Sequence, residues 1–204
     1  LAMHKVTGLV LAASLCLQAA ALIIPRWADE EHFGKYQDAW KLLNQAVGTT
    51  YFLVKSTYLT HSPLWGDNFQ CVTARTTEVN AGNKTVVYEY RFKNMTRSKK
   101  VRDYTTSHEV EATMHYFYKK PNAIKFGLGG TRMFAETIIF TNGRTCNLLS
   151  VPILQGRQEC ELWVKGSHIN AIPACCSFLF DYLCRKRVTF TIYNKTECDS
   201  EQPR

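Results

Sequence analysis

The sequence lacks the motifs of the common enzyme and metal-binding classes. It has no Cys-x-x-Cys pair, no HExxH zinc motif, no GxSxG elbow and no phosphate-binding loop. The six histidines show no metal-ligand spacing. The glycine-rich run 127–130 lies between two predicted strands and opens no helix, so it predicts a turn and not a nucleotide loop. We therefore expect neither enzyme activity nor a metal or other cofactor.

Long apolar runs are absent beyond residue 21. The stretch from Met3 to Ala21 combines a positive charge at Lys5, an apolar run over 6–17 and three closing alanines. This pattern predicts a secretory signal peptide over residues 1–21. A membrane span is not expected, because the apolar run is too short and has the wrong flanking residues. We expect a soluble, secreted protein with a single domain over residues 22–204.

Cysteine, by contrast, is plentiful. Removal of the predicted signal peptide leaves seven cysteines, and an exported chain oxidises most of its thiols. Because seven is odd, at least one thiol is free, capped or linked to another chain. Three Asn-x-Ser/Thr sequons, at Asn83, Asn94 and Asn194, predict glycosylation and fit the same extracellular location.

Acidic residues are outnumbered by basic ones, and the formal net charge is +8. The basic residues cluster at 97–102 and 185–187. Two interpretations are open: solvated loops and a helix end, or a surface that binds acidic glycans of the heparin type. A secreted chain without a recognisable nucleic-acid motif is not expected to bind nucleic acid.

Helical signals are sparse, and most of the chain alternates with period two. Helices are predicted only at 38–47, where Trp40, Leu43 and Val47 recur at helical spacing, and at 173–184, which begins with proline. Strands are predicted near 49–59, 69–79, 84–93, 108–118, 122–127, 132–141, 145–151 and 159–165, with shorter pieces near 99–105 and 187–193. Hairpin signals separate several of them. The pattern predicts a mostly-β fold, either an antiparallel up-and-down barrel or a sandwich, and about eight strands make a barrel that holds one small ligand.

Alternation along each strand shows which side chains face the interior. One face of the strand 132–141 carries a single acid among three large apolar side chains: Phe134, Glu136, Ile138 and Phe140. Glu161 and Trp163 likewise share a face. An unpaired buried carboxylate is unfavourable, and its pKa rises until it is neutral or finds a cation. Glu136 therefore either pairs with a nearby Lys, Arg or Tyr or lies at a wet barrel mouth, or it is the counter-ion of a ligand ammonium.

The other strands supply aromatic inner faces. Two predicted inner sets are Val86, Tyr88, Tyr90 and Phe92, and His108, Val110, Ala112, Met114 and Tyr116. The first strand has one face made of Phe52, Val54, Ser56 and Tyr58. Five rings are candidates for a ligand cage, in which a desolvated cation–π contact contributes about 2 kcal/mol: Tyr58, Trp65, Phe126, Phe134 and Trp163. Because each ring alone is typical of ordinary barrel core, the amine hypothesis depends on rings and carboxylates together.

The block from Trp27 to Cys71 is the most specific part of the chain. Its Gln37-Asp38-Ala39-Trp40, Trp65-Gly66 and Cys71-Val72 are joined further on by Val151-Pro152, Glu161-Leu162-Trp163 and Ile172-Pro173-Ala174. With these pieces the chain resembles the tick histamine-binding proteins, a branch of the secreted lipocalins. The resemblance implies a lipocalin-like eight-stranded barrel, with a short N-terminal helix and a C-terminal α-helix packed outside. It also implies disulfides Cys71–Cys198, Cys146–Cys176 and Cys160–Cys184, with Cys175 left over.

Ligand-binding residues follow from the same resemblance, position by position. Matching in type are Tyr58, Trp65, Phe134, Glu161 and Trp163, while Glu136 stands where histamine binders have an acid and Phe126 where they have an aromatic residue. Ile124 replaces an aromatic residue. Two acidic anchors are replaced by Ser62 (or His61) and by His108, which we include among the candidate ligand-binding residues. Acids of a second, weaker site are replaced at Ala46 and Asn147.

The resemblance implies sequestration of a small mediator, since family members bind histamine, and in some cases serotonin, leukotrienes or other lipids, at a blood-feeding site. The leading hypothesis is a binder of histamine or a related biogenic amine. The lost acids and the basic balance leave a fatty-acid or eicosanoid carrier as the alternative. A third hypothesis is a surface that binds a host plasma or immune protein. We expect a monomer, with a disulfide-linked dimer through Cys175 as the alternative.

Overall fold

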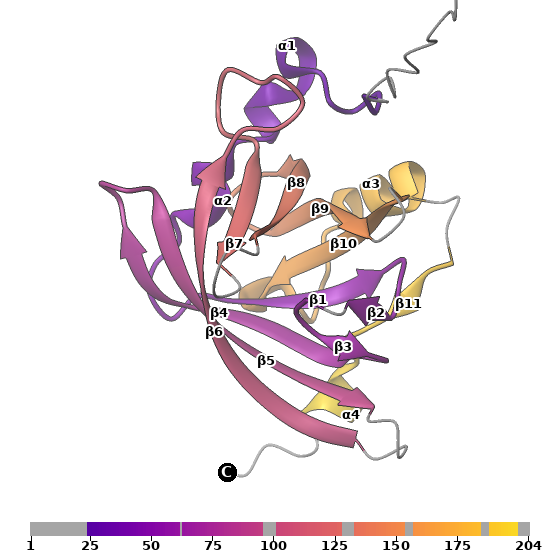
Figure 1. Ribbon diagram of the computed structural model, residues 1–204. Coiled ribbons are helices and arrows are strands. Elements are labelled where there is room, and N and C mark those ends of the chain that lie inside the picture. The colour runs from indigo at the N-terminus through magenta and orange to yellow at the C-terminus, as the bar shows by residue number, and fades with distance from the viewer. Residues whose placement is uncertain are drawn as a thin grey trace, which may run out of the picture.

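In the computed structural model a single antiparallel sheet closes on itself into a barrel (Figure 1). The structure describes residues 24–61, 63–95, 101–127, 133–153, 157–184 and 188–199. The barrel strands are β1 (Thr50–Ser56), β4 (Gln70–Asn80), β5 (Thr85–Met95), β6 (Val101–Thr113), β7 (Ala123–Gly127), β8 (Met133–Thr141), β9 (Cys146–Ile153) and β10 (Arg157–Lys165). Consecutive strands are neighbours, and β1 pairs with β10 to close the barrel. The predicted eight-stranded barrel is confirmed, and the sandwich alternative is wrong.

Short elements flank the barrel. They are the helices α1 (Glu30–Phe33), η1 (Gly34–Tyr36), α2 (Ala39–Leu43), η2 (Gly166–His168), α3 (Ala174–Cys184) and α4 (Lys195–Cys198), and the strands β2 (Thr60–His61), β3 (Gly66–Asp67) and β11 (Phe190–Thr191). The hairpin β2–β3 leaves the end of β1, and β11 pairs with β1 over only two residues of the strand predicted at 187–193. Helix α3 packs on β9 and β10 from outside, as expected for the C-terminal helix (Figure 1).

Helix α2 is shorter than the helix predicted at 38–47. The Asp38 side chain caps it by accepting a hydrogen bond from the backbone N of Lys41 at 3.0 Å. The helix ends at Leu43, because the chain turns at Gly48, whose φ of +88° suits a residue without a side chain, to enter β1. Val47, predicted on the apolar face, is consequently exposed.

A β-bulge in β1 interrupts the alternation that the sequence suggests. The pairing with β10 shifts register between Leu53 and Lys55. Leu53 packs in the barrel interior, whereas Val54 packs outside, beneath α3. Tyr58, beyond the bulge, lies again in the interior. The predicted shared face of Phe52, Val54, Ser56 and Tyr58 is therefore wrong.

A second bulge, in β8, has the same effect. Register with β9 shifts between Ile138 and Phe140. Ile138 lies in the barrel core, but Phe140 packs outside, where its ring stacks on that of Tyr36 with centroids 5.8 Å apart. The predicted inner face of this strand is thus correct up to Ile138 and wrong for Phe140.

Strand β6 runs through parts of both strands predicted at 99–105 and 108–118. It ends at Thr113, because Tyr116 and Phe117 have φ of 52° and 63° and turn the chain away from the sheet. Met114, predicted to face inward, is exposed. Tyr116 is buried, but from this turn and not from a strand.

Three disulfide bonds tie the flanking elements to the barrel. Cys146–Cys176 and Cys160–Cys184 fix α3 to β9 and β10, and Cys71–Cys198 joins β4 to α4 across 127 residues of sequence. These are the pairings that the family resemblance implies. Cys175 is free and exposed on α3.

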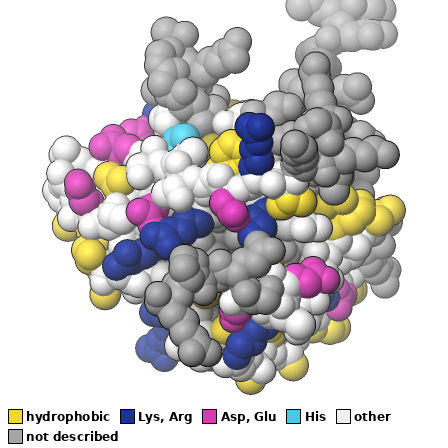
Figure 2. All heavy atoms as spheres, turned by 90° about the horizontal axis from the view of Figure 1, so that it is seen from below, with side chains coloured by type: hydrophobic (Ala, Val, Ile, Leu, Met, Phe, Trp, Pro, Cys, Tyr) yellow, Lys and Arg dark blue, Asp and Glu magenta, His cyan; other side chains and the backbone are white. Residues whose placement is uncertain are grey.

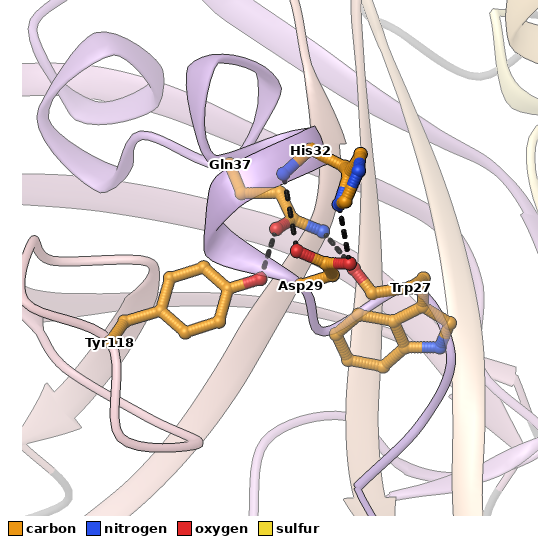
Figure 3. Close-up of polar contacts among 5 residues, drawn as sticks. All are labelled: Trp27, Asp29, His32, Gln37 and Tyr118. Atoms are coloured by element: carbon orange, nitrogen blue, oxygen red, sulfur yellow. Dashed lines mark hydrogen bonds and ion pairs between the residues drawn. The ribbon is translucent and has the colours of Figure 1, made fainter.

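A polar network holds the N-terminal segment against the barrel (Figure 3). The Gln37 side-chain amide donates to the carbonyl oxygens of Trp27 at 2.7 Å and Ile139 at 3.1 Å, and its Oε1 accepts from Tyr118 Oη at 2.5 Å. Asp29 caps α1 through the backbone N of His32 and also contacts its ring. Gln37 is 1% exposed, so these bonds satisfy an amide that burial would otherwise leave without water.

The surface mixes charges of both signs. On the face seen in Figure 2, Lys and Arg side chains lie beside Asp and Glu. Ion pairs such as Lys55–Asp181 and Arg91–Glu89, each at 3.0 Å, and Lys125–Glu111 show the same interleaving. The predicted basic cluster 185–187 and most of the cluster 97–102 lie outside the described residues. In the part of the chain that is described, no helix has the length and hydropathy to cross a membrane.

We expect the Cys160–Cys184 bond to contribute about 3 kcal/mol to stability, since it closes a loop of 24 residues. The double variant Cys160→Ser/Cys184→Ser should lower the free energy of unfolding, measured in urea, by about that amount. The matched control is Cys175→Ser, which removes an exposed free thiol and should leave it unchanged. Equal stability of all three proteins would show that the bond does not hold α3 in place.

Candidate functional site: two buried carboxyl groups in the barrel

Closure of the barrel brings the candidate residues together from distant parts of the sequence. Glu136 comes from β8, opposite Ile124 of β7, and Glu161 comes from β10, opposite Ser56 of β1. Tyr58 follows β1, and Trp65 lies in the β2–β3 hairpin. Because β1 pairs directly with β10, the residues that follow β1 meet the inner face of β10.

Glu161 is a fully buried acid held by two donors. Its exposed fraction is 0%. Tyr58 Oη donates to Glu161 Oε1, and Trp163 Nε1 donates to Glu161 Oε2 at 2.7 Å. Burial raises the pKa of Glu161, and the hydrogen bonds from Tyr58 and Trp163 partly offset that rise because they stabilise the anion. Glu161 is therefore the member of the pair better suited to carry a negative charge.

Glu136 has no such support. It is 1% exposed, and its Oε1 has no hydrogen-bond partner among the described residues. Burial, followed by repulsion from Glu161, raises the pKa of Glu136 well above its usual range. Neither carboxyl forms an ion pair with a lysine, arginine or histidine of the described chain. Two acids thus share one cation-free interior, and the pair holds a proton more tightly than two separate carboxyl groups would.

Aromatic rings and one histidine surround the pair. The His61 ring lies 4.8 Å from Phe134, 5.6 Å from Tyr58 and 6.0 Å from Trp65, centroid to centroid. Burial lowers the pKa of His61 to about 3, so its imidazole is neutral at physiological pH. Neither of its ring nitrogens has a hydrogen-bond partner within the described ranges, and Trp65 Nε1, whose interaction with Glu161 helps to lower the pKa of that acid, makes no hydrogen bond of good geometry. These groups face the cage with unused hydrogen-bonding capacity.

A cavity runs along the barrel beside Glu136. It measures about 30 Å³, counted as the space open to the centre of a water molecule. That is room for about two or three ordered waters, so a ligand has to displace them and press the side chains apart. Its walls are Leu42, Tyr51, Trp65, Ala74, Tyr88, Tyr90, Ile124, Phe126, Glu136, Asn147, Leu149 and Trp163.

The structure brings together all but one of the predicted ligand-binding residues. Trp65, Phe126, Glu136 and Trp163 line the cavity. Glu161 is hydrogen-bonded both to Trp163 and to Tyr58. The Phe134 ring packs against that of Phe126. His108 does not reach it, since its ring packs against Tyr90 at 5.9 Å and its Nδ1 lies 3.3 Å from the carbonyl O of Gly127. Ser62 lies outside the described residues, and the neighbouring His61 takes its place in the cage.

Sequence reasoning missed two groups. Glu159 is a third buried acid, whose Oε2 accepts from Thr57 Oγ1 at 2.7 Å. Alternation along β10 places Glu159 on the same face as Glu161 and Trp163, so the sequence pattern could have identified it as an inward-facing acid. Tyr51, which lines the cavity, was not recognisable because the bulge in β1 hides the correct inner face.

A closed antiparallel barrel with a helix packed outside is a lipocalin-type fold. The model of the family "Tick histamine binding protein" matches residues 27–200. The chain belongs to the tick histamine-binding protein family.

Individual relatives agree with this assignment. The chain is 33% identical over 201 residues to the male-specific histamine-binding salivary protein of Rhipicephalus appendiculatus, covering 95% of this chain and 96% of the relative. It is 30% identical over 168 residues to the female-specific histamine-binding protein 1 of the same tick, covering 82% and 85%. Among solved structures, Japanin from that tick, bound to cholesterol, matches with a TM-score of 0.50 at 17% identity, covering 76% of this chain and 97% of Japanin. The likeness to Japanin shows the fold alone.

Burial of Glu136 predicts a specific pH dependence of stability. Its native pKa lies above the unfolded value, so the stability that its buried neutral form contributes is present at acid pH and lost as the pH rises through the native pKa. Between roughly pH 5 and pH 8 the wild-type protein should therefore lose stability relative to Glu136→Gln, measured as the free energy of unfolding in urea. The exposed Glu78→Gln variant should follow the wild type across this range. Parallel curves for Glu136→Gln and wild type would contradict a raised native pKa.

Proposed function

We propose that this protein is a secreted binder that sequesters histamine or a related biogenic amine, such as serotonin, inside the barrel. The observation that supports the proposal most is the pair Glu136 and Glu161, which is buried among rings without a cation from the described chain. A ligand ammonium between the two carboxyl groups would supply the missing positive charge. No covalent bond is made or broken, so the protein acts by lowering the free concentration of the mediator.

The carboxyl groups and aromatic rings of the site provide two kinds of contact to a ligand amine. A hydrogen bond to a charged group contributes about 1.5–3 kcal/mol, and a desolvated cation–π contact contributes about 2 kcal/mol. The ammonium would lie on Glu136 and Glu161, and the ligand ring would stack against Trp65, Phe134 and Tyr58. Nanomolar affinity corresponds to about 12 kcal/mol at the standard state, so burial of the ligand ring in the cage has to supply the part that these polar contacts do not.

The interior favours an amine over the alternative of a fatty acid or eicosanoid. The anionic head group of such a lipid would meet two carboxyl groups, and no lysine or arginine lines the described cavity to bind it. The third hypothesis, a surface that binds a host plasma protein, gains no support from the mixed charges of the face in Figure 2.

Secretion at a feeding site fits the salivary relatives and gives the proposal its physiological role. There the protein would suppress host inflammatory and haemostatic responses by removing the amine. The predicted signal peptide lies outside the described residues. Disulfide bonds in the structure agree with an oxidising compartment.

The sequons differ in accessibility, which predicts where glycans attach. Asn83 and Asn194 are exposed. The Asn94 side-chain amide is half-buried and donates to the carbonyl O of Trp65 at 3.0 Å, so attachment there would break a contact that holds the β2–β3 hairpin. Mass spectrometry of the protein secreted from eukaryotic cells should find glycans on Asn83 and Asn194 and none on Asn94. High occupancy of Asn94 would show that this contact does not form during secretion.

The central test is amine binding by variants that keep the shape of the site. Glu136→Gln and Glu161→Gln should each weaken histamine or serotonin binding at least tenfold, or about 1.4 kcal/mol, in calorimetric titration. The control Glu109→Gln changes an exposed acid of β6 and should bind as the wild type does. Unchanged affinity in both buried variants would rule out the carboxyl pair as the ammonium site.

Proton release gives an independent reading of the same mechanism. A bound ammonium stabilises the ionised pair, so binding should expel the proton that the pair retains. The measured binding enthalpy should then vary with the ionisation enthalpy of the buffer, and affinity should rise from roughly pH 6 to pH 8. An enthalpy that is the same in every buffer would contradict a proton held by Glu136 and Glu161.

A further inference from the structure

The cavity has a second polar end, which the proposed ammonium site does not use. Tyr51, Tyr88 and Asn147 line it, and Thr76 lies opposite Tyr88 in the pairing of β4 with β5. All four are nearly fully buried: Tyr51, Tyr88 and Asn147 are 4% exposed and Thr76 is 0% exposed. Leu42 of α2 lies beside them, so this end of the cavity is the one that α2 covers.

Two hydroxyl groups at this end have unused hydrogen-bonding capacity. Tyr51 Oη and Thr76 Oγ1 are buried and make no hydrogen bond of good geometry with the described residues, although Asn147 lies beside Tyr51 and Tyr88 beside Thr76. A buried polar group without a partner costs about 1–3 kcal/mol, so a ligand group that bonds to them recovers that energy. The amide of Asn147 is already in use, since its Oδ1 accepts from Thr141 Oγ1 at 2.7 Å.

This end of the cavity carries no formal charge. Burial raises the pKa of Tyr51 to about 12, and burial followed by the neighbouring Tyr51 raises the pKa of Tyr88. Both phenols therefore keep their protons at physiological pH. A second ammonium placed here would be desolvated without a counter-ion, which is strongly unfavourable, whereas a hydroxyl can both donate and accept.

The two ends are separated along the strands by an apolar middle. Asn147 of β9 pairs with Thr141 of β8, which lies five residues along β8 from Glu136, with one bulge between them. Four strand rises correspond to about 13 Å between the backbones, before the side chains reach inward. Ile138 and its partner Leu149 lie between the two ends, and Leu149 lines the cavity there. An aromatic ring with a short aminoalkyl arm on one side and a polar group on the other matches this arrangement.

We propose that Tyr51 and Thr76 form hydrogen bonds with an uncharged hydroxyl group of the ligand. The barrel would then bind hydroxylated aromatic monoamines more tightly than their deoxy analogues and than diamines. This inference rests on the proposed amine-binding function and names the chemical class within it. A site built to bond a ligand hydroxyl discriminates strongly against an analogue that lacks it, because its own polar groups then stay unsatisfied.

The test uses amines that differ only in the hydroxyl: serotonin against tryptamine, and tyramine against phenethylamine, with cadaverine as the diamine. In calorimetric titration of the full protein, each hydroxylated amine should bind at least tenfold more tightly than its partner, and cadaverine more weakly than either. Tyr51→Phe and Thr76→Val should each reduce the ratio within a pair by at least threefold, without weakening the deoxy amine. Tyr36→Phe, which removes a half-exposed hydroxyl outside the barrel, should keep the wild-type ratio.

The outcomes separate the two levels of the proposal. If no amine binds, the proposed function itself fails. If serotonin and tryptamine bind equally, and tyramine and phenethylamine do too, the proposed amine binding stands. The proposed hydrogen bonds from Tyr51 and Thr76 to a ligand hydroxyl are then overturned. A ratio that persists in both Tyr51→Phe and Thr76→Val also overturns them. Melting temperatures at or above that of the wild type confirm folding, and a rise is expected because each variant removes a buried hydroxyl that makes no good hydrogen bond.

Discussion

Closure of the sheet between β1 and β10 is the constraint on which the interior depends. It places Ser56 opposite Glu161 and brings Tyr58, just beyond β1, within hydrogen-bonding reach of that acid. Helix α3, fixed to β9 and β10 by two disulfides, covers the adjoining outer face. Without closure Glu161 would be hydrated and its pKa ordinary. A closed barrel instead isolates two carboxyl groups from water, and that isolation raises the pKa of both.

Strand order and number followed from alternation and turn residues, because side chains on a strand alternate faces wherever the sheet is regular. Predictions failed where it is irregular. The bulges after Leu53 and Ile138 reverse the faces of Val54 and Phe140, and such bulges leave no clear mark in the apolar pattern. Tyr116 and Phe117 adopt left-handed backbone conformations just after β6. Sequence rules do not predict this conformation for bulky aromatic residues, so the end of β6 was not predictable.

The candidate site was predictable in part. A single acid among large apolar residues marked Glu136, and the family resemblance supplied Trp65 and the cysteine pairings. The cage position of His61, and the hydroxyl of Tyr51, depend on how a hairpin folds over the barrel end and on where a bulge falls. Those are properties of the closed sheet and not of any one segment, so no local pattern indicates them.

The bond between Cys71 and Cys198 has a topological consequence. It joins two residues 127 positions apart in sequence, and the segment between them includes every barrel strand except β1 and the start of β4. A protease that cuts any single loop between these cysteines leaves two fragments that remain covalently attached, and the hydrogen-bonded strands keep both in register. Nicked molecules would therefore survive as one particle, and only a reducing agent together with unfolding would let the pieces separate.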